Sequence, residues 1–467
     1  MSRIRTGSRQ GGGAVVTVAA LSATFGGILV QLIVDLTVAF DAAGLTGIAQ
    51  IAVTLAVVGG VFFGIAVFVG GIVTANAVST VIAGRTREIA LLRLLGASGR
   101  SLRGEIVRGG LVQGLLGAVI GAVVAVVLVA AGAEIAFQTG TLTRFAVPLA
   151  SPGLLLPMLA VIASTVLASW AGSRRVLEVA PAQAAGSSAE PRYDELRGRR
   201  GRNTAAITLV IVGFVLLAGG VAVGLVSPVG VLIGLVGGMV SFTGIILGAP
   251  VLLPPLTALV GRAFGRGPVA RLASANAIRH PARSARAVIG LVIGVTLVTM
   301  FAVAAETFGT VMRASSDANP EVIAALQQFI SASTAIMSVL LGFSVVLAAV
   351  GMVNTLSLSV LQRRRELGLL RALGFTASQV RSMVVLEAAQ MIVAATLLGL
   401  LLGIAYGWSG AIAVFGSLPG IGVIPPSIPV PILVAVVVVG TVITVVSAVV
   451  PARRATRVTP VEALAVA

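Results

Sequence analysis

The sequence contains no cysteine, no lysine and a single histidine, His280, and each of these absences excludes a class of chemistry. Without cysteine the chain has no disulfide, no thiol nucleophile and no thiolate metal ligand. One histidine is too few for a metal site with two imidazole ligands, and no acidic cluster replaces it. Without lysine there is no Walker A motif, because that loop needs its lysine to reach the β- and γ-phosphates. We therefore expect no catalytic, cofactor-binding or metal-binding site in this chain and no ATPase activity of its own.

Charged residues are also scarce. They make up 10% of the 467 residues, whereas hydrophobic residues make up 57%, and the mean hydropathy is +1.10. A soluble chain of this length needs far more charge to cover its surface. The apolar residues fall in long runs, and roughly 20 residues of helix cross the hydrocarbon of a bilayer. They do not alternate with polar residues, as the strands of a membrane barrel do. The composition therefore predicts an all-α integral membrane protein.

The apolar runs predict about ten transmembrane helices. The runs lie near 14–38, 49–80, 106–132, 152–172, 204–226, 229–253, 287–308, 325–358, 383–408 and 430–450. The first run follows a basic start, but it is too long for a signal peptide and lacks a clear small-x-small cleavage site. We therefore expect it to stay in the protein as the first span.

All 32 basic residues are arginine, and their distribution predicts the topology. Thirty of them lie before the first span or after every second span, and only Arg144 and Arg313 lie in the opposite loops. Positive charge stays on the cytoplasmic side of short loops. We therefore expect a multi-pass protein with both termini in the cytoplasm. The net charge of +17 is then explained by the topology, so we expect no nucleic acid partner. We expect membrane lipid around the spans.

The chain contains an internal repeat. The segment from Arg85 to Gly96, RTREIALLRLLG, aligns with the segment from Arg363 to Gly374, RRRELGLLRALG, with eight of twelve residues identical at an offset of 278. Further matches at offsets of 278 and 279 are Asn76 with Asn354 and Pro152 with Pro431. Both copies enter the membrane from the same side, so the repeats are parallel and related by an axis along the membrane normal.

The repeat divides the chain into three predicted parts. Residues 1–186 form a first four-helix repeat with spans one to four. Residues 187–267 form a cytoplasmic linker and a two-helix connector, spans five and six. Residues 268–467 form a second four-helix repeat with spans seven to ten.

The repeated segment has the pattern of a short amphipathic helix. Leucines at i, i+1 and i+4 spacing predict one apolar face in each copy. These leucines are Leu91, Leu92 and Leu95 in the first copy and Leu369, Leu370 and Leu373 in the second. Gly96 and Gly374 are the expected C′ glycines that end the two helices. One interpretation places the leucines in lipid at the membrane surface. The other is that both copies contact a twofold-symmetric cytoplasmic partner.

The motif Asn-x₈-Arg-x-Arg-Glu-[Ile/Leu]-[Ala/Gly]-Leu-Leu-Arg-x-Leu-Gly, present in both copies, resembles the FtsX/MacB-type permease domain of ABC transporters. Two further stretches are similar to this family: ANAIRHPARS at 275–284, and the ending PARRA at 451–455 followed by PVEAL at 460–464. The predicted layout of two permease repeats and a connector resembles the ten-span arrangement of bacitracin exporters, the BceB-like permeases.

In these type VII ABC systems, the cytoplasmic segment after the second span of each repeat is a coupling helix that docks onto a separate ATPase subunit. The resemblance therefore implies two copies of an ABC ATPase subunit as partners, with ATP and Mg²⁺ bound on those subunits. It also implies a bacterial plasma membrane. The implied docking residues are Arg85, Arg87, Glu88, Leu91, Leu92, Arg93, Leu95 and Gly96, together with Arg363, Arg365, Glu366, Leu369, Leu370, Arg371, Leu373 and Gly374.

By this resemblance, the chain is a permease subunit that couples ATP hydrolysis elsewhere to export or extraction of a hydrophobic or amphipathic substrate, such as a lipid, peptide or drug. Family members usually carry a large extracellular domain after the first span of a repeat, whereas this chain has only 39–48 and 309–324 at those places. Two alternatives stay open. One is a mechanotransmission subunit that regulates a cell-envelope partner. The other is an ion-coupled secondary transporter, which requires several ionisable residues at mid-membrane.

Three of the polar residues within the predicted spans are candidates for an intramembrane role: Asn76, Asn354 and Glu387. The asparagines predict hydrogen bonds between helices, which are typically worth about 0.6 kcal/mol. An acid at the bilayer centre costs roughly 2.5–3.5 kcal/mol, so Glu387 predicts either an ion pair near the inner surface or a functional group. Trp170 and Trp408 lie at span ends, as interface anchors do.

Overall fold

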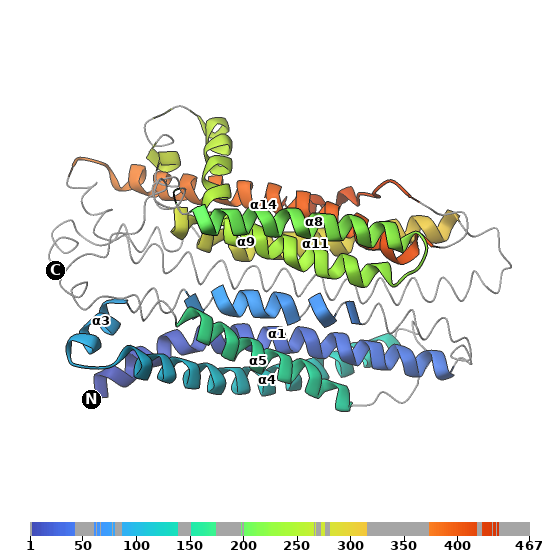
Figure 1. Ribbon diagram of the computed structural model, residues 1–467, viewed down its shortest axis with the longest axis horizontal. Helices are drawn as coiled ribbons and strands as arrows, with labels where there is room; N and C mark the ends of the chain where they lie inside the picture. Colours follow the sequence, from blue (N-terminus) through green and yellow to red (C-terminus); the bar gives the residue numbers. More distant parts are fainter. Residues whose placement is uncertain are drawn as a thin grey trace. The chain divides into compact units, whose positions relative to one another are not determined.

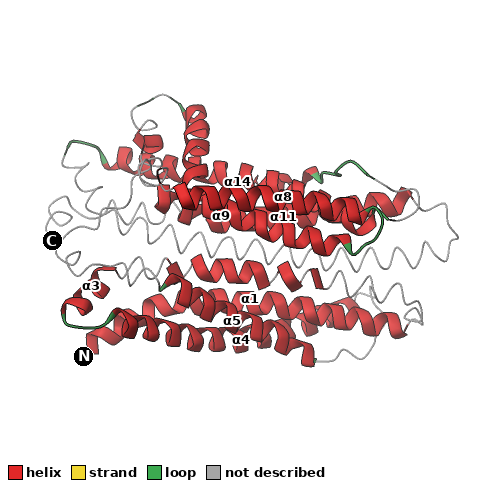
Figure 2. Cartoon of the chain, in the orientation of Figure 1, coloured by secondary structure: helices red, strands yellow, loops and turns green. Residues whose placement is uncertain are grey.

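The computed structural model describes residues 2–42, 60–79, 86–138, 151–173, 198, 200–265, 267, 272–275, 281–314, 373–417 and 423–438, apart from the single positions 62, 66, 77, 432 and 436. Within these residues every regular element is a helix, as Figure 1 and Figure 2 show. Seven of the described helices are long and apolar enough to cross a membrane. The chain is therefore an all-α integral membrane protein, which confirms the class predicted from composition.

The seven long helices coincide with the first, third, fourth, fifth, sixth, seventh and ninth predicted spans. They are α1 (Ser2–Ala42), α4 (Gly99–Gln138), α5 (Leu155–Gly172), α8 (Arg200–Gly224), α9 (Gly230–Gly261), α11 (Pro281–Ala314) and α14 (Ala377–Phe415). Three short elements accompany them: α3 (Thr86–Leu94), η1 (Pro152–Leu154) and η3 (Arg262–Phe264). The runs near 49–80 and 430–450 are described only in part, and the run near 325–358 lies outside the described residues. The total of ten spans stays a prediction.

Three of these helices are much longer than a bilayer requires, and α1 is the longest of them with 41 residues. α4 has 40 residues and α14 has 39, so each is about 60 Å long at a rise of roughly 1.5 Å per residue. The hydrocarbon layer is only about 30 Å thick. The first turns of α4 carry Arg100, Arg103 and Arg108, which marks the end that projects beyond the hydrocarbon. The hydropathy of the sequence predicted this span from residue 106, because an apolar run does not reveal the polar start of its helix.

The helices α4 and α14 each begin at a capped residue. The Oγ of Ser98 accepts a hydrogen bond from the backbone N–H of Ser101, 3.1 Å away, ahead of α4. Thr376 caps α14 with its Oγ1 3.2 Å from the N–H of Gln379, whose side chain accepts in return from the N–H of Thr376 at 2.9 Å. This reciprocal pair is a capping box. Ser98 and Thr376 lie at the repeat offset of 278.

The chain divides into two compact units, Met1–Ser188 and Ala189–Ala467. In the first unit α1, α4 and α5 pack together. α4 meets α1 through two glycines, since a Cβ on Gly117 would lie 2.5 Å from the Cβ of Ala19, and one on Gly121 would lie 2.5 Å from that of Ala23. Small residues let membrane helices approach closely. The predicted boundaries after residues 186 and 267 stay predictions.

In the second unit α11 packs against α14 in the same manner. A Cβ on Gly399 would lie 2.8 Å from the Cβ of Val295, and one on Gly403 would lie 2.5 Å from that of Thr299. Gly399 is the counterpart of Gly121 at the repeat offset of 278. The helix pairs α1–α4 and α11–α14 are therefore built alike, which agrees with the internal repeat.

The helices α8 and α9 form a hairpin that packs against α14 within the second unit (Figure 1). Tyr406 of α14 is buried in this contact, and its hydroxyl lies 2.9 Å from the Oγ of Ser241 on α9. Its ring lies 6.2 Å from that of Phe214 on α8 and 6.4 Å from that of Phe242 on α9. The connector is therefore fastened to the second repeat by an aromatic cluster around one buried hydrogen bond.

Candidate functional site

The first copy of the repeated segment folds as the short helix α3, which ends at its predicted glycine. The N–H of Gly96 bonds to the carbonyl oxygen of Arg93 at 3.1 Å, and that of Ala97 bonds to the carbonyl oxygen of Leu92 at 3.0 Å. Gly96 has a φ of +94°. These two bonds around a left-handed residue form a Schellman motif, which satisfies the last carbonyls of the helix. The prediction that Gly96 is a C′ glycine is confirmed.

A tight elbow joins α3 to α4. Only residues 95–98 separate the two helices, and Gly96 ends one while Ser98 caps the next. The second copy repeats this elbow in its described part, because Gly374 has a φ of +98° and Thr376 caps α14. The direction of α3 is therefore fixed relative to α4 by backbone geometry. Figure 1 shows α3 at the same end of the first unit as the N-terminus.

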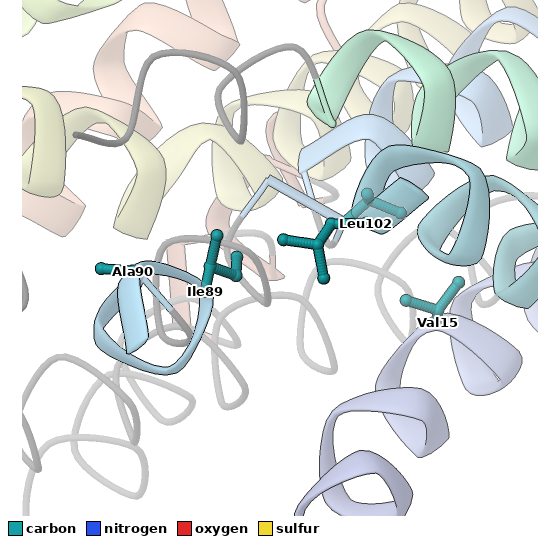
Figure 3. Packing of buried hydrophobic residues seen from close by; sticks show 5 residues of the cluster. Val15, Ile89, Ala90 and Leu102 are labelled. Carbon is teal, nitrogen blue, oxygen red and sulfur yellow. The ribbon is translucent and has the colours of Figure 1, made fainter. Parts of the chain in front are cut away.

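The inner face of α3 is part of the core of the first unit. Ile89 and Ala90 are buried in a cluster with three residues from outside α3 (Figure 3). These are Val15 of α1, Leu102 of α4, and Val78, which precedes α3 in the sequence. Leu92, Ala97 and Ile106 are partly buried against the same cluster. One side of α3 thus packs against the membrane helices.

The outer face of α3 and the first residue of the elbow carry a strip of exposed leucines. Leu91, Leu94 and Leu95 are 49%, 56% and 85% exposed. In the second copy Leu373, the counterpart of Leu95, is 71% exposed. We call Leu91, Leu94 and Leu95 the leucine strip. Large apolar side chains held in the open by a rigid support are typical of an interaction surface.

The expectation that Leu91, Leu92 and Leu95 share one face is wrong, because Leu92 lies on the opposite side of the helix from the other two. Leu92 follows Ile89 by three residues and lies with it on the inner side, in contact with the core. The prediction used the spacing of the leucines alone. The burial of Ile89 and Ala90 shows which side of α3 faces inward. Leu94, which was not among the predicted site residues, belongs to the exposed side.

The remaining predicted docking residues are described only in part. Arg93 lies half-buried near the end of α3. Arg87 and Glu88 are part of α3, but the structure does not describe their side chains. The predicted residues outside the described part of the chain are Arg85, Arg363, Arg365, Glu366, Leu369, Leu370 and Arg371.

A polar contact that was not predicted lies directly beside the elbow. The Nε of Arg103 donates to the Oγ of Ser173 at 3.2 Å, and its Nη2 donates to the carbonyl oxygen of Trp170 at 3.2 Å. The guanidinium carbon lies 4.7 Å from the centre of the Trp170 ring. We call Arg103, Trp170 and Ser173 the arginine clasp. It ties the start of α4 to the end of α5, where Trp170 had been expected only as an interface anchor.

The predicted intramembrane polar residues fall in different settings. Asn76 is half-buried in the partly described second span, and Asn354 lies outside the described residues. Glu387 is buried in α14. One turn further along α14 lies Gln390, which is also buried and accepts a hydrogen bond from the Oγ of Ser274 at 3.1 Å. Among the described residues no group of three or more His, Cys, Asp or Glu side chains is placed to hold a metal ion.

Comparison with known proteins gives two findings. The sequence matches the family described as FtsX-like permease C-terminal twice, over residues 60–181 and 338–460. The matches begin at the repeat offset of 278 and together cover just over half of the chain. The first contains α3 and the arginine clasp, and the second contains Leu373 and Gly374.

A relative from Bacillus subtilis strain 168, named as the uncharacterized ABC transporter permease YknZ, is 30% identical over 144 residues. The aligned part is 31% of this chain and 34% of the relative. The chain thus matches about a third of the length of that curated relative.

Proposed function

The chain belongs to the FtsX-like permease family, and on this premise we propose that it is the membrane subunit of an ABC transporter, driven by a separate ATPase subunit that binds ATP and Mg²⁺. Permeases of ABC transporters are generally non-catalytic membrane subunits. The absence of lysine supports the proposal that a separate subunit hydrolyses the ATP, because this chain has no Walker A lysine.

The observation that carries the proposal is the leucine strip. α3 buries its inner face in the core and leaves Leu91, Leu94 and Leu95 exposed at the basic end of the first unit. An elbow of four residues prevents the helix from swinging freely. A force applied to the strip therefore reaches α4, which crosses the membrane. A coupling element needs both properties: an apolar contact surface and a stiff connection to the spans.

The repeat supports two such contacts. Leu373 is exposed at the position equivalent to Leu95, and it is followed by the same glycine and the same type of cap. We propose that each segment docks one copy of the ATPase subunit. By this proposal both segments and both termini lie in the cytoplasm of a bacterium. The substrate is hydrophobic or amphipathic and reaches the permease from the bilayer, since the loops on the other side are short.

The test replaces the exposed leucines in the full chain and measures co-purification of a co-expressed ABC ATPase subunit. Leu95→Ala and Leu373→Ala should each weaken association by about 2 kcal/mol, roughly 30-fold, as truncation of a contact anchor does. The double variant should lose association almost entirely, because two linked contacts act with avidity. Membrane insertion should not change, since the spans are untouched.

Two controls separate docking from stability. Leu159→Ala removes a leucine that is as exposed as the strip but lies on α5, and it should leave association unchanged. Leu92→Ala removes a side chain that packs against the core, so it should lower the thermal stability more than the affinity. If the double variant Leu95→Ala/Leu373→Ala binds the ATPase as the wild type does, these segments are not the docking site and the leucines face lipid instead.

A further inference from the structure

The arginine clasp joins two helices at the point where α3 meets the membrane bundle. Arg103 donates to Ser173, which is fully buried, and to the last-turn carbonyl of Trp170. The hydroxyl of Ser173 in turn donates to the same carbonyl oxygen at 2.9 Å. A cation at a helix C-terminus is stabilised by the unpaired carbonyls there. The indole face adds a cation–π contact, since 4.7 Å is within the range of that interaction.

Neighbouring residues of α4 connect the clasp to α3. Leu102 is buried in the cluster that holds Ile89 of α3, and the next residue, Arg103, reaches α5. The first turns of α4 are therefore held on one side by the coupling segment and on the other by the end of α5. Together with the elbow at Gly96 and Ser98, this makes a continuous chain of contacts from the leucine strip to α5.

The second repeat lacks the side chains for the same contact. Arg381 stands at the position equivalent to Arg103 and is exposed. The positions equivalent to Trp170 and Ser173, at the offset of 279, are Val449 and Ala452. Neither offers an aromatic ring or a hydroxyl group. The sequence thus keeps the arginine in both repeats but provides its side-chain partners in only one.

We propose that Arg103 is a positioning residue that holds α3, α4 and α5 together as one body, so that a displacement of the first coupling segment is carried to the end of α5. The first coupling segment is then stiffer than the second, and the two ATPase contacts are not mechanically equivalent. This inference rests on the proposed function, because the displacement it transmits is one imposed by an ATPase subunit.

A direct test of the tie needs no ATPase. The chain has no cysteine, so spin labels attach only where cysteines are introduced. Glu105→Cys and Ala171→Cys place one label on the exposed start of α4 and one on the exposed end of α5. In the full chain reconstituted in lipid, the distance distribution between them should be narrow, and Arg103→Gln should broaden it. Arg381→Gln, the matched control in the second repeat, should leave it narrow. An unchanged distribution in Arg103→Gln overturns the proposal.

The functional arm uses the full chain with its co-purified ABC ATPase subunit. Arg103→Gln should bind the ATPase within about twofold of wild type and leave the KM for ATP unchanged. It should reduce the permease-dependent increase in the maximal hydrolysis rate fivefold or more, the lower end of typical coupling effects. Arg103→Lys, which keeps the charge but not the planar fork, should retain an intermediate increase. A purely stabilising role would lower the amount of folded complex without changing the rate per complex.

The outcomes separate this inference from the proposed function. A wild-type chain that holds no ATPase refutes the proposed function and the role of Arg103 with it. A bound ATPase that is equally stimulated by wild type and Arg103→Gln refutes the role of Arg103 alone, as does an equal loss in Arg381→Gln. Where Arg103→Gln lowers expression, Ser173→Ala serves instead, since it removes one acceptor and keeps the arginine. It should broaden the label distances in the same direction, and an unchanged distribution counts against the clasp.

Discussion

Gly96 is the residue on which the geometry of the elbow between α3 and α4 depends. Its φ of +94° lies in the left-handed region, and an added Cβ would meet nothing within 4 Å. The glycine is therefore required by its backbone conformation and not by crowding. Gly96→Ala should destabilise the elbow by roughly 1 kcal/mol, because an L-residue is strained at this φ. It should also weaken ATPase association, since α3 would change its direction relative to α4.

A matched control for this prediction lies eight residues further on. Gly104 sits inside α4, where a Cβ also meets nothing within 4 Å, but its backbone is helical. Gly104→Ala should leave the stability unchanged or raise it by about 0.5–1 kcal/mol, as alanine does within a helix. Thermal unfolding of the purified chain in detergent compares the two variants. If Gly96→Ala is as stable as Gly104→Ala, the left-handed turn does not determine the geometry of the elbow.

At the residue scale the sequence predicted some features of this site and missed others for identifiable reasons. Gly96 was predicted because a glycine after an amphipathic stretch is a local signal. The side assigned to Leu92 was wrong, because Leu92 packs against a cluster that includes Val15 and Leu102, which come from other helices. The role of Arg103 was missed because its partners lie 67 and 70 residues away. A single sequence does not show such pairings. The repeat does show that Arg103 has an equivalent arginine, Arg381, at the offset of 278.

At the scale of helices, the close contacts α1–α4 and α11–α14 determine the architecture of each unit. Both rely on glycines that bring two backbones together, and in lipid such packing replaces the hydrophobic drive that water supplies. Gly121→Val should therefore destabilise the first unit by about 1–3 kcal/mol, the usual range for overpacking. Gly132→Val on the same helix is the control, because a Cβ added at Gly132 meets nothing within 4 Å. Equal unfolding temperatures for the two variants would contradict the observed α1–α4 contact.

The existence of these helices was predictable, but their lengths and contacts were not. Apolar runs identified seven helices that the structure describes, since a span must be apolar to lie in lipid. The starts of α4 and α14 were missed because they lie outside the hydrocarbon and are set by the caps at Ser98 and Thr376. The glycine contacts were not predicted either, because glycine is frequent throughout the chain, with 57 residues, and only the fold shows which of them meet a neighbour.

At the scale of the whole molecule, the connector makes the two repeats unequal. In the second unit the hairpin α8–α9 covers the face of α14 that carries Tyr406. The counterpart of Tyr406 at the offset of 278 is Leu128 of α4, which is exposed. Val112, the counterpart of the buried Gln390, is exposed as well. The repeat therefore gives each unit the same helix pair, while the connector adds a second layer to one of them.

The topology predicted from the distribution of arginine has its own test. Reporter fusions after residues 100, 190, 275, 370 and 467 should report a cytoplasmic position, because thirty of 32 arginines lie in those segments or before the first span. Fusions near residues 44, 142, 228, 316 and 420 should report the opposite side. Activity of a cytoplasmic reporter at residue 142 or 316 would contradict the ten-span arrangement.

The most direct test of the proposed function is ATP hydrolysis by the reconstituted parts: the purified chain alone, the proposed ABC ATPase subunit alone, and the two together in lipid. The chain alone should hydrolyse no ATP above background. The two together should hydrolyse ATP faster than the ATPase alone, and Leu95→Ala/Leu373→Ala should abolish this increase. Hydrolysis by a preparation of the chain free of any ATPase subunit, or a rate that the double variant leaves unchanged, would contradict an ATPase-driven permease coupled through these two segments.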